Sequence, residues 1–242
     1  VITDEERYLD REKMPGIPVI AMDVRLAQFT ENTRKYGYIF DKKEEAEEYI
    51  DWYKGWENML RERTDTLSEA EKKLVYIGSY RPGRTSFQVP GRDNYRAVMV
   101  RAAGGKYIGD EISGSSIVNV DPEWVITRNP DVMILSGSNQ FIGYDITDPS
   151  EVTAVIEDLL NRVDFAEVKA VKNKDAYMVS HAYILCGGAS GLIGTIYYAK
   201  WLYPELFEDM DAQEMHQEFV TRFQHLDLNV KDVICVYPPP KS

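Results

Sequence analysis

The chain has 242 residues, of which 44% are hydrophobic and 28% charged, and these values are typical of a folded globular protein. Its 28 basic and 40 acidic residues give a net charge of −12, which argues against a general nucleic-acid-binding protein. No apolar run reaches the roughly 20 residues of a membrane-spanning helix, and the residues after Val1 show no signal-peptide pattern.

The first part of the sequence predicts one strand followed by two helices. An apolar run bounded by glycine and proline predicts a strand over 16–24, and we expect a helix over 24–36. The segment 41–63 predicts a long helix, because apolar residues recur along it at spacings of three and four: Ala46, Tyr49, Ile50, Tyr53, Trp56 and Leu60.

From residue 74 onward, predicted strands alternate with predicted helices. The segment 131–137 is almost continuously apolar, as in strands that are buried on both faces of a parallel sheet. The alternation favours an α/β fold with a mostly parallel sheet. The expected strands cover 74–80, 131–137 and 176–180, the expected helices cover 93–103, 151–161 and 189–202, and a short extended segment covers 115–120.

A short helix is expected between the extended segment 115–120 and the strand at 131–137. Asp121 can cap its start, Pro122 suits its first position, and Asn129 followed by Pro130 ends it. Glu123 then lies in the first turn, where a carboxylate interacts favourably with the helix dipole, by about 0.3–1 kcal/mol. This interaction alone gives Glu123 a structural role.

The last predicted helix begins at Asp211, with Glu214 three residues later, which is the spacing of a capping box. We expect its apolar stripe to be buried, and we expect His216 and His225 to lie at the surface. The apolar stripe consists of Met215, Phe219 and Phe223, and a strand-like VICVY follows near the end of the chain.

Polar and aromatic residues follow three of the predicted strands. Open α/β sheets bind ligands at the carboxyl ends of their strands, so these residues are candidates for ligand contact. Two arginines and one imidazole among them suit a large ligand that is partly anionic or contains a metal. Solvated loop charges are the alternative explanation for the arginines. The candidates are Tyr80, Arg81, Arg84, Asn139, His181 and Tyr183.

The sequence shows no pattern of a resident metal, cofactor or catalytic triad. Its three histidines and two cysteines lack metal-binding spacings, so the sequence indicates no resident metal and leaves open a ligand that brings its own metal. The glycine-rich segment 186–191 could offer backbone N–H groups to an anion, or serve close helix packing. Cys186 and Cys235 permit one disulfide at most, and free thiols are the interpretation that we favour.

Several stretches in this order resemble the class III (cluster A-II) substrate-binding proteins of ABC transporters, which capture iron-siderophores, haem or cobalamin. The resemblance covers about residues 14–226. It rests on GIPVIAMDV, EEAEEYIDWY, RAVMVRAAGGKYIG, VDPEWVITRNPDVMIL and AKWLYPELFEDMDAQEMHQEFVTRF.

This resemblance implies a periplasmic-binding-protein fold of two α/β lobes joined by a long interlobe helix. Residues 1–40 would be the last strand and helix of the N-terminal lobe, 41–72 the interlobe helix and linker, and 73–242 the C-terminal Rossmann-like α/β lobe that binds ligand. Most of the N-terminal lobe is then expected to be missing, and with it half of the binding cleft.

The resemblance also implies a partner and a location. In the family, a surface glutamate of each lobe contacts arginines of the membrane permease, and Glu123 occupies the matching position ahead of Asn129, Pro130 and Asp131. We therefore expect a permease and a metal-chelate small molecule as partners, and no nucleic acid. The expected location is extracellular or periplasmic, at the cell surface through a partner or through an N-terminal anchor that this chain lacks.

Two alternatives belong to other functional classes. The first is an enzyme on a related two-lobed α/β scaffold, such as a chelatase or a nitrogenase-like subunit. It should show convergent acid–base or cluster-binding residues, and the scattered cysteines and histidines count against it. The second is an interaction module that has lost transport function together with its N-terminal lobe.

Overall fold

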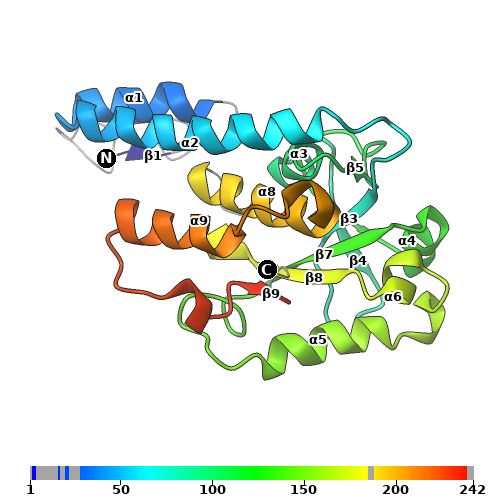
Figure 1. Ribbon diagram of the computed structural model, residues 1–242. Coiled ribbons are helices and arrows are strands. Elements are labelled where there is room, and N and C mark those ends of the chain that lie inside the picture. The colour runs from blue at the N-terminus through cyan, green and yellow to red at the C-terminus, as the bar shows by residue number, and fades with distance from the viewer. Residues whose placement is uncertain (1, 4–15, 17–19, 22–27, 185–187, 239–242) are drawn as a thin grey trace.

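The computed structural model describes residues 2–3, 16, 20–21, 28–184 and 188–238. Within these residues the centre of the molecule is a five-stranded sheet, whose first four strands are parallel and whose last strand, β9, is antiparallel (Figure 1). The predicted α/β fold with a mostly parallel sheet is therefore confirmed. The strand order is β5 (Lys106–Tyr107), β3 (Leu74–Gly78), β7 (Val132–Gly137), β8 (Ala176–Ser180) and β9 (Val236–Tyr237).

The central strand β7 is the segment whose continuous apolar sequence predicted burial on both faces. Its residues from Val132 to Leu135 are completely buried, because helices cover both faces of the sheet. Helix α5 (Ser150–Leu160) lies on one face (Figure 1). Helices α3 (Tyr95–Ala102) and α8 (Gly188–Leu202) lie on the other.

The predicted long helix is α2 (Lys43–Thr64), and its apolar stripe faces the rest of the molecule. Ile50 and Tyr53, for example, are almost completely buried. Helix α1 (Phe29–Ile39) packs beside it, and ends three residues later than predicted. Of the predicted strand at 16–24, residues 16 and 20–21 are described, and Ile20–Ala21 form β2, which pairs in parallel with β1 (Ile2–Thr3).

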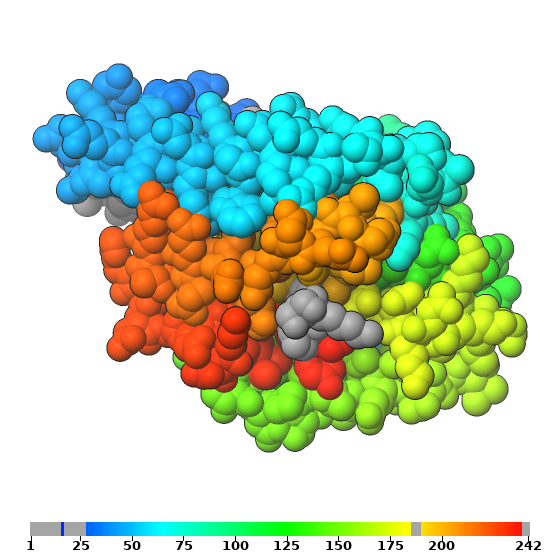
Figure 2. Space-filling view, in the orientation of Figure 1, coloured from blue at the N-terminus to red at the C-terminus, as the bar shows by residue number. Residues whose placement is uncertain are grey.

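Polar contacts join α2 to the C-terminal helical segment, which comprises α9 (Ala212–Glu218) and a π-helical turn, η5 (Phe219–Phe223). The indole Nε1 of Trp52 donates to Glu218 at 2.8 Å, and Arg222 forms an ion pair with Glu48 at 2.6 Å. Figure 2 shows this segment, in orange, lying directly against α2, in cyan. The long helix is thus part of the same packed body as the sheet.

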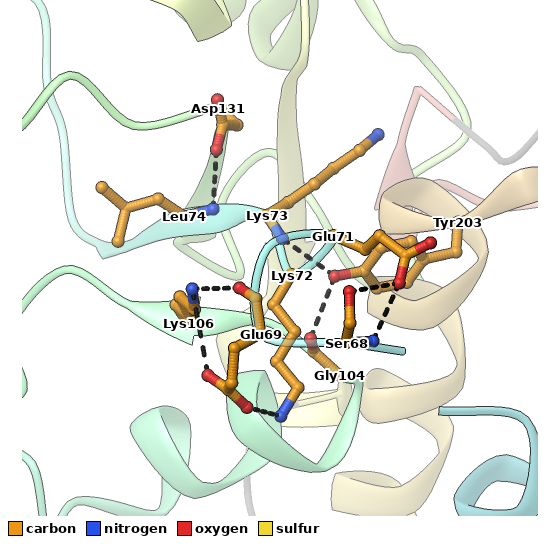
Figure 3. A network of polar contacts seen from close by, with 10 residues as sticks. All are labelled: Ser68, Glu69, Glu71, Lys72, Lys73, Leu74, Gly104, Lys106, Asp131 and Tyr203. Atoms are coloured by element: carbon orange, nitrogen blue, oxygen red, sulfur yellow. Dashed lines mark hydrogen bonds and ion pairs between the residues drawn. The ribbon is translucent and has the colours of Figure 1, made fainter. Parts of the chain in front are cut away.

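The connection between α2 and β3 is held by buried and half-buried groups (Figure 3). The Tyr203 hydroxyl accepts a hydrogen bond from the Lys73 N–H and donates one to the Gly104 carbonyl, both at 2.9 Å. The carboxylate of Asp131 accepts from the Leu74 N–H at 2.8 Å. These contacts fix the point at which β3 enters the sheet, next to β5 and β7.

Helix α4 (Pro122–Arg128) starts and ends where predicted, although one detail differs. Pro122 occupies the first turn, and Asn129 ends the helix in the left-handed conformation, with φ of 49°. Asp121 has the extended backbone of a capping residue, but its side chain makes no capping hydrogen bond, so that expectation was wrong. Asp211, in contrast, caps α9 by accepting from the Gln213 N–H at 2.8 Å, as predicted.

The remaining described elements are short. Strands β4 (Phe87–Pro90) and β6 (Ile117–Val120) form an antiparallel pair, of which β4 follows the Pro/Gly-rich loop after β3. A short helix, α7 (His181–Ile184), directly follows β8, at a position for which no element was predicted from the sequence. The others are η3 (Val163–Phe165), α6 (Lys169–Asn173), η4 (Pro204–Phe207) and η6 (Val230–Asp232).

Candidate functional site

A cavity of about 380 Å³ opens at the carboxyl ends of β3, β7 and β8, where ligands bind in open α/β sheets. Its volume lies at the lower end of the range for small-molecule pockets, which is about 300–1,000 Å³. We call it the strand-end cavity. Its lining residues are Ser79, Tyr80, Arg81, Arg96, Ser136, Gly137, Ser138, Asn139, Phe141 and His181.

Four of the six predicted ligand-contacting residues line the strand-end cavity: Tyr80, Arg81, Asn139 and His181. Arg84 does not line it, and lies exposed in the turn that follows Arg81. Tyr183 does not line it either. Its ring stacks on that of Tyr144 at a centroid distance of 4.2 Å, and it packs so closely over Gly143 that a Cβ there would lie 2.9 Å from the ring.

Tyr80 contributes an aromatic wall to the cavity. Its ring stacks on that of Phe87 at a centroid distance of 5.3 Å, and its hydroxyl bonds the carboxylate of Asp158 on α5. Burial and this carboxylate raise the pKa of Tyr80 to about 12, so the phenol stays neutral at physiological pH. Its hydroxyl is therefore already engaged by the fold.

Arg96 lines the cavity but was not predicted, because it was only one of several charges in the helix expected over 93–103. It lies in the first turn of α3 and is 5% exposed. Its Nη2 atom bonds Nδ1 of His181 at 2.9 Å. A signal for this position was present in the sequence: Arg96 shares the three-and-four spacing of the buried residues Met99, Val100 and Ala103.

His181 opens α7 at the end of β8, so its ring reaches the cavity from the third strand. Partial burial and the nearby Arg96 guanidinium both lower its pKa. The imidazole is consequently neutral at pH 7, when it can accept a hydrogen bond at one nitrogen and donate at the other.

Buried titratable groups also occur away from the cavity. The prediction of a surface position for His216 was wrong, because this residue is completely buried, whereas His225 is exposed as expected. The imidazole of His216 bonds the hydroxyls of Tyr144 at 2.8 Å and Tyr197 at 3.1 Å. Burial lowers its pKa to about 3.

Neither a metal cage nor a disulfide is found within the part of the chain that the structure describes. No group of three or more histidine, cysteine, aspartate or glutamate side chains converges there. Cys235 is a buried free thiol whose pKa is raised by desolvation, while Cys186 lies outside the described residues, as does part of the glycine-rich segment 186–191.

A larger hollow of about 570 Å³ lies between α1, α2 and η5. It is lined by apolar rings and by charges that already have partners, such as Arg222, which pairs with Glu48 and Glu218. It is also remote from the strand ends in the fold, and its ionic groups are satisfied. We therefore place the candidate site at the strand-end cavity.

Glu123 lies on the surface in the first turn of α4, where the sequence placed it. Its carboxylate is 3.4 Å from the Thr127 hydroxyl one turn later. Among the described residues, no helix combines the length and the apolar character that crossing a membrane requires. Because Glu123 is exposed, its carboxylate is accessible to a partner.

Comparison with known proteins identifies the family to which the chain is similar. The family described as periplasmic binding protein matches residues 4–182. The molybdate-binding protein MolA of Haemophilus influenzae is 22% identical over 227 residues, which are 92% of this chain and 54% of MolA. The chain therefore spans about half the length of this curated relative, and the expected absence of most of an N-terminal lobe stays a prediction.

Solved structures confirm the fold. The TroA-like periplasmic binding protein FepB from Veillonella parvula is similar with a TM-score of 0.76 and 23% identity, over 91% of this chain and 64% of FepB. CeuE of Helicobacter pylori with Ni(II) bound is similar with a TM-score of 0.68 and 17% identity, over 95% and 69% of the two chains. At these identities the likeness establishes architecture and leaves the ligand open.

Proposed function

We propose, since the chain belongs to the periplasmic binding protein family, that it is the substrate-binding component of an ABC importer, or a part of that component. The family consists of solute-binding proteins, so the enzyme alternative is set aside. The proposed ligand is a metal chelate of the iron-siderophore, haem or corrinoid type, which brings its own metal and is delivered to a membrane permease.

The observation that supports this proposal is the composition of the strand-end cavity. Its wall presents the guanidinium groups of Arg81 and Arg96, and no aspartate or glutamate of the described residues lines it. Hydroxyl and amide groups from Ser138 and Asn139 add neutral hydrogen-bonding capacity. Such a wall attracts an anionic ligand and disfavours a free metal cation, because the two guanidinium charges repel a cation.

The relatives support a ligand that contains a metal. MolA is described as a molybdate-binding protein, and CeuE was solved with Ni(II) bound. A second CeuE structure holds a Ni–His complex. Carried over to this chain as part of the proposal, molybdate and this complex favour either an oxyanion of a metal or a metal chelate whose ligand carries a carboxylate. Both fit the cationic wall, and the second is the class that we propose.

Docking to the permease is assigned to Glu123 in this proposal. The residue is exposed, and its position on α4 leaves its carboxylate on the surface. A net charge of −12 also favours association with a basic partner surface. A site of action outside the cytoplasmic membrane, in the periplasm or at the cell surface, belongs to the same proposal.

The binding proposal is tested by calorimetric titration of the chain with a ferric siderophore, haem, cobalamin and molybdate. We expect one of these to bind, and we expect Arg81→Ala to weaken it about tenfold through the loss of a charged contact. Arg92→Ala is the matched control, because Arg92 is exposed and does not line the cavity. Absence of binding by the whole panel would contradict the proposal.

The docking proposal is tested with Glu123→Arg in a binding assay with the permease in detergent or nanodiscs. We expect weaker permease binding and unchanged ligand affinity. Glu151→Arg is the control, because Glu151 is an exposed carboxylate in the first turn of α5 and so has the same relation to its helix. Equal permease affinity of the two variants would return Glu123 to a purely structural role.

A further inference from the structure

The Arg96 guanidinium is buried, yet no carboxylate among the described residues pairs with it. Its neighbours are the Tyr95 hydroxyl, 3.4 Å from Nε, and the imidazole of His181. Arg101 on the same helix, in contrast, pairs with Asp110 at 2.7 Å. Arginines are rarely buried without a partner, because desolvating an uncompensated charge is costly. An anion in the cavity would supply the missing countercharge.

The hydrogen bond between Arg96 and His181 determines which imidazole nitrogen carries the proton. The two bonded atoms, Nη2 and Nδ1, are 2.9 Å apart. A guanidinium has N–H donors and no acceptor, so Nδ1 must be the acceptor and carries no proton. In a neutral imidazole the proton is then on Nε2. The low pKa of His181 is consistent with the neutral form.

This arrangement is the reverse of that around a metal-binding histidine. A ligating imidazole normally uses one nitrogen lone pair for the metal and donates its other N–H to a carboxylate or carbonyl. In His181 the Nδ1 lone pair is engaged by a cation, and Nε2 is protonated. Neither nitrogen therefore offers a lone pair to a metal while the contact with Arg96 persists.

We propose that the strand-end cavity holds its ligand through anionic oxygen atoms at Arg96 and Arg81, and that His181 positions the Arg96 guanidinium instead of coordinating the ligand's metal. This inference rests on the proposed function and narrows its substrate class. The ligand is an oxyanion, or a chelate that presents anionic oxygens, and its metal keeps the coordination that it has in solution.

The other charged and polar groups of the cavity agree with this assignment. Arg81 adds a second cation from the loop after β3, and Asn139 can donate from its amide. Planar guanidinium groups donate paired hydrogen bonds to two oxygen atoms of a carboxylate or oxyanion. The contact is therefore directional as well as electrostatic. Arg96 belongs to α3 and Arg81 to the loop after β3, so the two reach the cavity from different segments.

The test compares two variants of His181 that separate hydrogen-bond acceptance from metal coordination. Asparagine keeps an acceptor oxygen near the position of Nδ1 but has no imidazole, whereas leucine has neither. Each variant is titrated calorimetrically with molybdate and with Ni(II)–histidine. We expect His181→Asn to bind molybdate within about threefold of the unmodified chain, and His181→Leu to bind it about tenfold more weakly. His225→Asn, an exposed histidine outside this cavity, is the control.

A ligand-independent measurement is the ¹⁵N spectrum of the imidazoles at pH 7, in which the His181 signals are assigned by their loss in His181→Asn. We expect the proton on Nε2. A proton on Nδ1, or His181→Asn as weak as His181→Leu, would overturn the inference while leaving a molybdate-binding chain and the proposed function in place. If neither probe binds, the assignment of the ligand fails with the proposed function, and the spectrum still decides the tautomer.

Discussion

Lys200 and Arg96 are both buried cations without a carboxylate partner among the described residues, yet their surroundings differ. Lys200 is 4% exposed and lies in α8, where its Nζ donates to the carbonyls of Phe207 at 2.5 Å and Met210 at 2.9 Å. Phe207 is the last residue of the short helix η4 and Met210 lies three residues beyond it, at the end where backbone dipoles carry partial negative charge. Arg96 bonds a neutral imidazole at the edge of a cavity.

This difference in surroundings indicates that Lys200 is a structural cation and that Arg96 is available for ligand binding. The fold surrounds Lys200 with fixed acceptors, so its charge is compensated whether or not anything is bound. Among the described residues Arg96 has only partial compensation, from Tyr95 and His181, and it lines the strand-end cavity. A buried charge that the fold leaves incompletely satisfied beside a cavity is thus a better guide to function than exposed loop charges such as Arg84.

The largest effect that this comparison predicts is in Lys200→Met. Methionine keeps much of the side-chain volume but removes both charged hydrogen bonds and leaves two buried carbonyls without partners. We expect a loss of about 3 kcal/mol in the free energy of unfolding, measured by urea denaturation. Ligand affinity should stay unchanged. A loss below about 1 kcal/mol would show that Lys200 is not compensated as its contacts indicate.

The next largest effect is the pH dependence of the free energy of unfolding that His216 causes. Its pKa is about 3 in the folded chain and near 6.5 when unfolded, so below pH 6.5 the unfolded chain binds a proton that the folded chain does not. Stability from this residue is complete above pH 6.5 and falls with decreasing pH. We expect a loss of about 2 kcal/mol between pH 6.5 and pH 5.

Measurement of this effect requires the difference between two pH profiles, because carboxylates also titrate in this range. His216→Leu lacks the imidazole, so its free energy of unfolding should change less steeply between pH 6.5 and pH 5 than that of the unmodified chain. The variant should also be less stable at pH 7, since the hydroxyls of Tyr144 and Tyr197 lose their partner. Parallel profiles would contradict the assigned burial of a neutral imidazole.

Tyr203→Phe tests another buried group whose hydrogen bonds are made within the fold, and its expected effect on stability is smaller. The variant leaves the Lys73 N–H without its acceptor and the Gly104 carbonyl without its donor, at the entry of β3 (Figure 3). We expect a loss of about 1–2 kcal/mol in thermal or urea unfolding. Tyr38→Phe, at a tyrosine that is 64% exposed, should change stability by less than about 0.5 kcal/mol.

The smallest effect on stability is expected for Arg96→Met, and it sharpens the contrast with Lys200. Removal of an incompletely compensated buried charge should lower the free energy of unfolding by less than about 0.5 kcal/mol, or raise it. Binding of an anionic ligand should nevertheless weaken more than tenfold, to be measured by calorimetry. Destabilisation as large as that of Lys200→Met, with intact binding, would make Arg96 a structural residue.

Much of the fold was predictable because it depends on local periodicity and on local end signals. The apolar run at 131–137 and the stripe along 41–63 correspond to β7 and α2, whose burial follows from these patterns. The strand ends also located the candidate site, since Arg81 and His181 line one cavity. Asp121 shows the limit even of local rules, because its side chain does not complete the cap that its type and place suggested.

The features of the fold and of the candidate site that could not be predicted depend on contacts between distant segments. By itself, the sequence determined the alternation of strands and helices and the residues at each strand end, because these follow from neighbouring residues. Only the tertiary structure decided that Arg96 and His181 meet, 85 residues apart, and that His216 lies buried between two tyrosines. Helix packing across the sheet creates these contacts, and the burial of a charge depends on the elements that cover it.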